Sequence, residues 1–188
     1  MRSPIEVTGY PHDLTAPVRL ADGAELIVRA ILPADRDRIR RLLDRMSPLT
    51  RYRRFLTPVP RPTAAMIEYL VTVDYRDRLA LVAVAGDEIV AVARYDRLAA
   101  PADPGEAEAA IVVEDAWQRR GLGTQLLVRL IAAARERGIH TFVAEVLAEN
   151  RPMMGLLRAV GDAARIAADG PEVVVHLTLD DVPVNPAI

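Results

Sequence analysis

The stretch QRRGLGTQLL, from Gln118 to Leu127, decides how the rest of the chain is interpreted. Its two glycines, Gly121 and Gly123, follow an apolar run and open a pattern of apolar residues at helical spacing. The first amides of a helix have no partners within the helix, so such a turn offers N–H groups and the positive end of the helix dipole to an anion. Glycine lets a phosphate approach these amides closely, and Thr124 can add a hydroxyl. A plain chain turn beside solvated arginines would use the same residues, but the basic character of this strand–glycine–helix unit favours phosphate binding.

Buried strands and amphipathic helices alternate on either side of this turn. The apolar strand EAAIVV precedes it, and a helix with a continuous apolar stripe follows and ends at Gly138. The strands IHTFVAEVL and EVVVHLTL come next, separated by a short helix for which Asn150 is a suitable cap. Upstream, Asp22–Gly23 and Gly86–Asp87 each predict a hairpin, with helical segments between the two hairpins. The order of elements is therefore mixed, with hairpins first and strand–helix alternation later.

Length and composition restrict the kind of protein. The 188 residues are 51% apolar and 27% charged, which is enough for one globular core and short for two. Residues 1–16 contain two prolines and no periodicity, so we expect an N-terminal arm followed by a single domain over residues 17–188. A net charge of −2 gives no reason to expect a nucleic acid or a membrane as partner, and the absence of cysteine with only three scattered histidines predicts no metal site. No segment resembles a signal peptide or a membrane span, which predicts a cytoplasmic protein.

The glycine turn differs from the common nucleotide-binding loops. A dinucleotide fingerprint needs three spaced glycines and an acidic residue after the next strand, and a nucleoside-triphosphate loop needs Gly-Lys-Ser or Gly-Lys-Thr. The turn instead resembles the acetyl-coenzyme A signature of the Gcn5-related N-acetyltransferases (GNAT), Gln/Arg-x-x-Gly-x-Gly/Ala, through Gln118, Gly121 and Gly123. The flanking strands and NRPMMGLLRAVG extend the resemblance over residues 26–179. We therefore expect an α/β (α+β) fold of the GNAT type, with a central mixed, twisted sheet of six or seven strands and helices on both faces.

The resemblance implies a site for acetyl-coenzyme A as cosubstrate. Backbone groups of the strand before the signature would pair with the pantetheine arm as an added strand would, and amides of the turn would hold the pyrophosphate. This strand and the next would splay apart to admit the thioester. The asparagine at the head of the next helix would contact the pantetheine, serve as a helix cap, or do both. The expected cofactor-binding residues are Ile111, Val112, Val113, Gln118, Arg119, Arg120, Gly121, Leu122, Gly123, Thr124, Asn150 and, as a pocket wall, Met153.

Two further stretches, AEAAIVVEDAWQ and SPLTRYRRF, are similar to the bacterial protein-lysine acetyltransferase branch of the family. Many family members carry a tyrosine seven residues after the asparagine as acid for the departing thiolate, and here that position is Leu157, as in this branch. A water or another tyrosine would then protonate the thiolate, or the thiolate would leave unassisted, consistent with a thiol pKa near 8.5.

In some proteins of the protein-lysine branch a nucleotide-binding or ligase-like domain precedes the catalytic domain; we expect a free-standing catalytic domain here. The arginines of RYRRF could dock an acidic partner or the acceptor protein, or could simply be solvated.

Glu108 is the expected general base. A lysine amine has a reference pKa near 10.4, so at pH 7 only about one molecule in 2,500 carries the attacking lone pair. A carboxylate beside the amine can accept its proton. Glu108 lies on the strand expected to carry the thioester and matches the glutamate of the AE pair in the protein-lysine branch. Glu106 shares its face by the two-residue period and is the main alternative, followed by Glu145 on the neighbouring strand.

Three functions are compatible with these residues. The first is an N-acetyltransferase that acts on a primary amine, with protein lysines as the expected acceptors. The second is an acetyltransferase for a small amine, which would need an enclosed pocket formed by the loops after Phe55 and before Glu106. The third is a non-enzymatic acyl-coenzyme A-binding module, in which Glu108 would lie away from the thioester. The sequence does not distinguish a monomer from a dimer.

Overall fold

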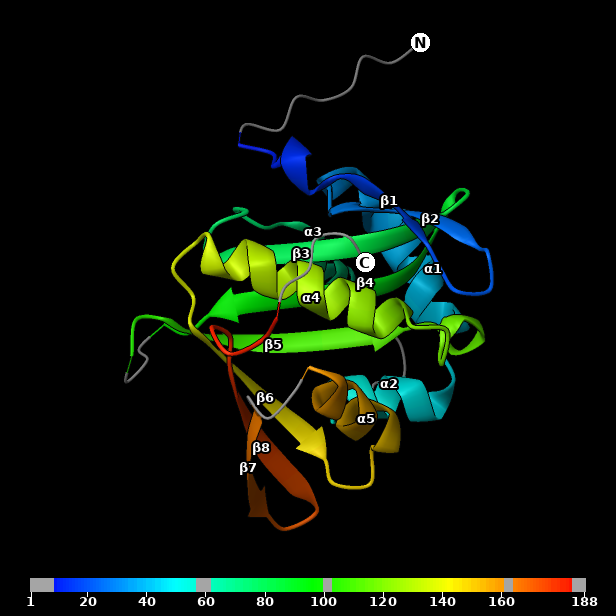
Figure 1. Cartoon of the computed structure of the whole chain (residues 1–188). Coiled ribbons are helices and arrows are strands. Elements are labelled where there is room, and N and C mark those ends of the chain that lie inside the picture. The colour runs from blue at the N-terminus through cyan, green and yellow to red at the C-terminus, as the bar shows by residue number, and fades with distance from the viewer. Residues whose placement is uncertain (1–8, 57–61, 100–102, 161–163, 184–188) are drawn as a thin grey trace.

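One mixed β-sheet runs through the computed structural model, which describes residues 9–56, 62–99, 103–160 and 164–183 (Figure 1). Its eight strands are β1 (Ala16–Arg19), β2 (Glu25–Ala30), β3 (Arg78–Ala85), β4 (Glu88–Arg97), β5 (Glu106–Val113), β6 (Thr141–Leu147), β7 (Ala164–Asp169) and β8 (Glu172–Thr178). Their order across the sheet is β1-β2-β3-β4-β5-β6-β8-β7. Neighbouring strands are antiparallel except β5 and β6, which are parallel because helix α4 (Leu122–Arg135) crosses over between them.

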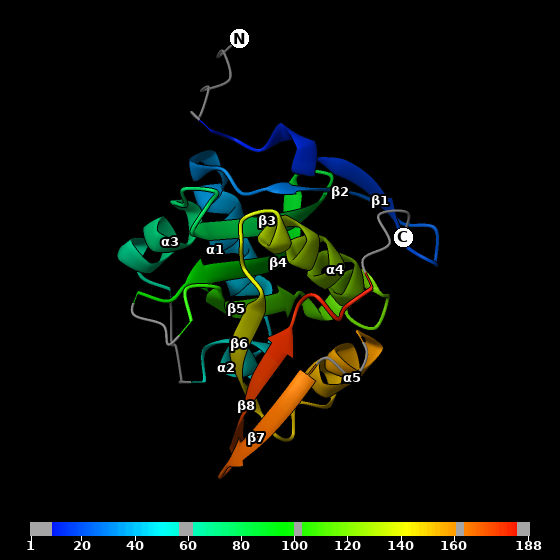
Figure 2. The same ribbon diagram turned by 60° about the vertical axis from the view of Figure 1, so that its left-hand side comes forward.

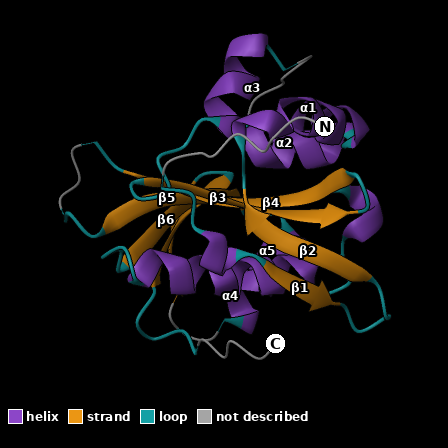
Figure 3. Cartoon of the chain, turned by 90° about the horizontal axis from the view of Figure 1, so that it is seen from above, coloured by secondary structure: helices purple, strands orange, loops and turns teal. Residues whose placement is uncertain are grey.

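Helices cover both faces of this sheet, as expected (Figure 3). One face carries α1 (Arg36–Arg45), α2 (Pro48–Phe55) and α3 (Ala64–Val71), and the other carries α4 and α5 (Arg151–Ala159). Short 3₁₀ turns are η1 (His12–Leu14), η2 (Pro33–Asp35) and η3 (Asp115–Trp117). Figure 2 shows α5 beside the hairpin of β8 and β7, where its own small apolar cluster packs against the sheet.

The helices form where the apolar spacing predicts them. Leu126, Leu130 and Ile131 of α4 are at most 1% exposed, and burial of each such side chain stabilises the fold by about 1.5–3 kcal/mol. Helix α2 begins with Ser47 as its cap, whose side chain accepts a hydrogen bond from the Thr50 amide. The sheet face beneath α1 and α3 and the face beneath α4 thus form two separate layers of core.

The sheet has one strand more than the six or seven expected. The additional strand is β7, which pairs with β8 across a turn at Gly170, where φ is +68°. Its sequence, ARIAAD, contains one β-branched residue and no clear alternation, because an edge strand that is mostly exposed does not need a buried face. The signal for a strand was therefore absent from the sequence.

The described part of the N-terminal arm contacts the rest of the fold. There, Tyr10 packs edge-on against Tyr75 and donates a hydrogen bond from its hydroxyl to the Ala30 carbonyl at 3.1 Å.

None of the described helices combines the length and the apolar character needed to cross a membrane.

The sheet opens between β5 and β6, and this opening positions the site. The two strands pair only through Glu106–Glu108 and Thr141–Val143, although β5 continues to Val113 and β6 to Leu147. Beyond Glu108 the strands diverge, as the separate directions of β5 and β6 in Figure 1 show. The expected splay of these two strands is confirmed.

Candidate active site

The free edge of β5 faces the opening between the strands. In an antiparallel ladder, alternate residues turn their N–H and C=O groups toward the partner strand. The Glu114 amide donates to the Val90 carbonyl at 2.8 Å, and the Glu106 carbonyl accepts from the Leu98 amide at 3.4 Å, so even-numbered residues of β5 face β4. The backbone groups of Ile111 and the N–H of Val113 therefore point toward the opening, where an extended ligand could pair with them.

The glycine turn presents free amides to the same opening. Arg119 and Gly121 both adopt left-handed backbone angles, with φ of +59° and +83°, and Gly121 caps α4 without any side-chain hydrogen bond. The Gln125 amide is the first to bond back along the helix, to the Gly121 carbonyl. The amides of residues 122–124 therefore have no partner within the helix, which is the arrangement expected for an anion site.

The fold constrains the two glycines differently. Gly121 has a backbone conformation that other residues adopt only with strain. A Cβ on Gly123 would lie 3.8 Å from the Leu156 and Val113 side chains, which is ordinary packing distance. The folded chain thus has room for a methyl group at Gly123, so packing within the fold does not by itself require a glycine there.

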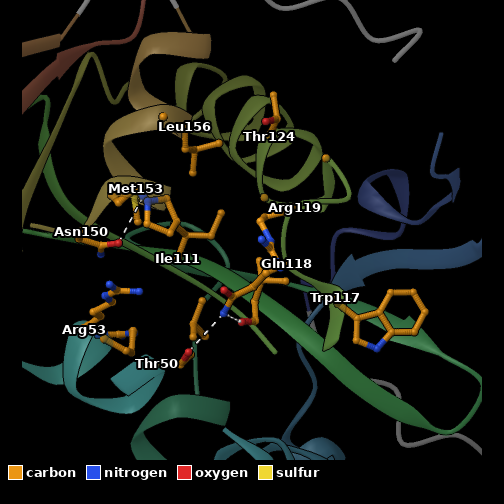
Figure 4. A pocket seen from close by; sticks show the side chains of 17 residues that line it. Thr50, Arg53, Ile111, Trp117, Gln118, Arg119, Thr124, Asn150, Met153 and Leu156 are labelled. Atoms are coloured by element: carbon orange, nitrogen blue, oxygen red, sulfur yellow. Dashed lines mark hydrogen bonds between the residues drawn. The ribbon is translucent and has the colours of Figure 1, made fainter. Parts of the chain in front are cut away.

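These elements enclose a cavity of about 270 Å³ (Figure 4). The expected cofactor-binding residues that line it are Ile111, Val112, Val113, Gln118, Arg119, Gly121, Gly123, Thr124, Asn150 and Met153. Val112 lines the wall, although its backbone groups face β4. Leu122 and Arg120 do not line the cavity, because Leu122 is buried in the core and Arg120 forms an ion pair with Asp22 and stacks on Trp117 at 4.3 Å.

Gln118 connects the turn to helix α2. Its side-chain amide donates to the Val113 carbonyl at 2.9 Å and to the Thr50 hydroxyl at 3.2 Å (Figure 4). Thr50 in turn donates to the Asp115 carboxylate at 2.8 Å, which also accepts from the Ser47 hydroxyl and amide. Desolvation opposes ionisation of Asp115, but these hydrogen bonds outweigh it and lower the pKa of the carboxyl group. Thr50 and Asp115 lie 65 residues apart and meet only in the fold, so their spacing in the sequence does not predict this network.

Asn150 is seen here as a helix cap. Its side-chain oxygen accepts a hydrogen bond from the Met153 amide at 3.3 Å, at the start of α5. The residue is 7% exposed and lines the cavity. Its side-chain NH₂ group remains available as a donor, so the capping role does not prevent contact with a ligand.

A second cavity, of about 480 Å³, continues from the first through the opening of the sheet. The residues that line both cavities are Arg53, Arg54, Ile111, Asn150, Met153 and Leu156.

Glu108 and Glu145 line the second cavity and lie on the same face of the sheet, whereas Glu106 lies outside both cavities. Glu108 is exposed, is the last residue of β5 paired with β6, and its side chain makes no hydrogen bond or ion pair with the described residues. Leu157 is buried at the wall of this cavity.

Comparisons with known proteins agree on one family. The model of the acetyltransferase (GNAT) family matches residues 40–161. Acetyltransferase PA5475 of Pseudomonas aeruginosa is 32% identical over 161 residues, which cover 84% of this chain and 85% of that protein. Acetyltransferase Pat of Mycolicibacterium smegmatis is 36% identical over 147 residues, which cover 77% of this chain but only 43% of that protein. The crystal structure of the GNAT domain of S. lividans PAT superimposes with a TM-score of 0.84 at 36% identity, covering 90% of this chain and 99% of that one.

Proposed function

The chain belongs to the acetyltransferase (GNAT) family and is an acetyl-coenzyme A-dependent N-acetyltransferase, for which we propose protein lysine side chains as acceptors and Glu108 as the general base. The observation that carries this proposal is the position of Glu108. It lies where β5 and β6 begin to diverge, in the cavity next to the free backbone edge of β5. A carboxylate there is beside the point at which a thioester held along that edge would meet an incoming amine.

The first cavity fits the cosubstrate. The amides of residues 122–124 suit a pyrophosphate, and the edge groups of Ile111 and Val113 suit the amides of a pantetheine arm. The side-chain NH₂ group of Asn150, which also lines this cavity, adds a hydrogen-bond donor. Acetyl-coenzyme A supplies the activated acetyl group, and the residues of the chain bind it, orient it and leave Glu108 facing the acceptor side.

The mechanism follows from this placement. Glu108 takes a proton from the lysine ammonium group, which frees the nitrogen lone pair to attack the thioester carbonyl carbon. A C–N bond forms, the C–S bond breaks and the sulfur leaves as a thiolate, while the nitrogen of the new amide gives up its second proton to water. Neither cavity is lined by a tyrosine from the described residues, and Leu157 cannot donate a proton. We therefore infer that the thiolate departs without a side-chain acid and takes its proton from water, as a leaving-group pKa near 8.5 permits.

Protein lysines are favoured as acceptors by the relatives. The Pat relative and the GNAT domain of S. lividans PAT are each 36% identical to this chain. The similarity of AEAAIVVEDAWQ to the protein-lysine branch gives the same indication. The loop segments whose closure would favour a small amine include residues 57–61 and 100–102, which lie outside the described residues. The third possibility, a binding module without catalysis, predicts that Glu108 lies away from the thioester site, whereas Glu108 lines the cavity that adjoins it.

The experiment that tests the acceptor class uses radiolabelled acetyl-coenzyme A. The protein is incubated with the label and a lysate of its host, and macromolecules are separated from small molecules before counting. We expect label in protein bands that resist hydroxylamine, as lysine amides do and thioesters do not. Label recovered only in a small amine would refute the proposed acceptor and support the small-molecule alternative.

A further inference from the structure

Two neighbouring arginines of α2, Arg53 and Arg54, lie at the junction of the two cavities. Both line each cavity, although charged residues on an amphipathic helix usually face solvent. Figure 4 shows the Arg53 side chain on the Asn150 side of the first cavity, across from Arg119 and the glycine turn. The arginines of RYRRF at these two positions are therefore not simply solvated; they form part of the wall of the site.

Neither of these two guanidinium groups has an ion-pair partner among the residues that the structure describes. Many other arginines, such as Arg29, Arg45 and Arg78, form ion pairs, but neither Arg53 nor Arg54 forms one with the described residues. The Arg53 Nε atom is buried and has no hydrogen-bond partner in the described structure. A buried donor without a partner is costly unless a ligand satisfies it.

The electrostatic surroundings of Arg54 favour an added anion. Burial lowers the pKa of Arg54 to about 10, and the nearby positive charge of Arg94 acts in the same direction. Glu108 and Asp96 exert the opposite, weaker influence. Even so, the guanidinium stays charged at neutral pH, and a carboxylate placed beside it would relieve both the desolvation and the repulsion.

The charges of the second cavity are arranged in two groups. Glu108, Glu145 and Glu172 lie on the strands, and Arg53 and Arg54 lie on α2. An acceptor that carries both an ammonium group and a carboxylate could satisfy both groups at once. The anion of such a ligand would not belong to the phosphates of the cosubstrate, which we assign to the glycine turn on the other side of the first cavity.

We propose that Arg53 and Arg54 form a carboxylate-binding subsite that selects acceptor lysines flanked by Asp or Glu. This inference rests on the proposed function, because it places the acceptor amine at Glu108. Arginine suits this role because its planar fork binds a carboxylate through two parallel hydrogen bonds. The carboxylate next to the lysine in sequence then pairs with α2 while the amine reaches β5.

The test compares two nine-residue peptides that differ only in the residues beside a central lysine, Glu-Lys-Glu in one and Gln-Lys-Gln in the other. We expect kcat/KM of the wild-type protein to be about tenfold higher for the Glu peptide, as one charge-assisted bond provides. In the Arg53→Gln/Arg54→Gln variant the ratio should fall to near one, because the Glu peptide loses more of its kcat/KM than the Gln peptide does. Arg54→Lys, which keeps the charge but not the fork, should retain a reduced preference and guards against a double variant that folds poorly.

The control is Arg158→Gln, because Arg158 is exposed on α5 and lines neither cavity. It removes the same charge and should leave the peptide ratio unchanged. A wild-type ratio near one, an equal loss for both peptides in the double variant, or an equal loss of preference in the control would overturn the inference. Efficient use of succinyl-coenzyme A with the Gln peptide, abolished in the double variant, would assign the subsite to the acyl chain and overturn it as well. Acetylation of neither peptide would refute the proposed function itself, whereas acetylation of both without preference would refute only this inference.

Discussion

Replacement of Glu108 by glutamine tests the proposed base with little risk to the fold. Glu108 is exposed, and its side chain makes no hydrogen bond or ion pair with the described residues, so Glu108→Gln should change the free energy of unfolding by less than about 0.5 kcal/mol. A positioned general base contributes about 10²–10⁴ in rate. Glu145 lines the same cavity and can take over part of the proton transfer, so we place the loss near the lower limit, at about 100-fold. This corresponds to about 2.7 kcal/mol of transition-state stabilisation.

The assay is steady-state acetylation of a lysine peptide, followed across pH, together with calorimetric binding of acetyl-coenzyme A. We expect kcat to fall by at least about 30-fold, affinity for acetyl-coenzyme A to stay within about threefold, and the acidic limb of the pH–rate profile to shift or vanish. Glu106→Gln is the matched control, because Glu106 lies two residues away on the same strand but outside both cavities. Near-normal turnover in Glu108→Gln, with Glu106→Gln impaired instead, would show that the reasoning from the cavity is wrong.

Three further substitutions test other parts of the structure. Gly123→Glu places bulk and negative charge in front of the free amides, so calorimetry should show at least about tenfold weaker binding of acetyl-coenzyme A, or about 1.4 kcal/mol, whereas Gly123→Ala should fold normally. Thr50→Val removes the partner of both Gln118 and Asp115 and should cost about 1–2 kcal/mol in urea unfolding, with Thr50→Ser as the control that restores it. Asp35 is 1% exposed and bonded to Arg29 by two 2.7 Å contacts, so Asp35→Asn should cost about 3 kcal/mol in the same assay. Although burial opposes it, the pairing lowers the pKa of Asp35, so its stabilisation is present above the unfolded pKa near 3.9 and is lost as pH falls through the folded value; equal urea midpoints of wild type and variant at pH 7 would contradict this account.

The sequence predicted those features that depend on local chemistry. Gly121 and Gly123 identified a helix start with free amides, and the apolar stripe that follows identified α4. The branching of the sheet after Glu108 was implied by the family resemblance, and the pairing of β5 with β6 confirms it. For the glycine turn and α4, the relevant residues lie within a few positions of one another or within a pattern with a recognisable period.

Features that depend on distant contacts were not predictable in this way. The hydrogen bonds from Thr50 to Asp115 and Gln118 join segments that nothing in the spacing relates, and β7 lacks the composition of a strand because it lies at an edge. Which backbone groups of β5 face the opening depends on the register with β4, which shows that Val112 differs from Ile111 and Val113. The placement of Arg53 and Arg54 inside the site depends on how α2 packs on the sheet, since their sequence alone suits a solvated helix face equally well.

The short pairing between β5 and β6 also has a mechanical consequence. Among the described residues, three residue pairs form the whole strand-to-strand connection between the part of the sheet that contains β1 to β5 and the part that contains β6, β8 and β7. The two parts of the sheet are therefore joined at one end only, and their pairing ends at Glu108. An extended ligand that pairs with the free edge of β5 would continue the ladder beyond Glu108 and fix the angle between the two parts of the sheet. Occupancy of the site should thus stiffen the whole C-terminal part of the sheet, and slower amide hydrogen exchange far from the ligand, in β8, would record it.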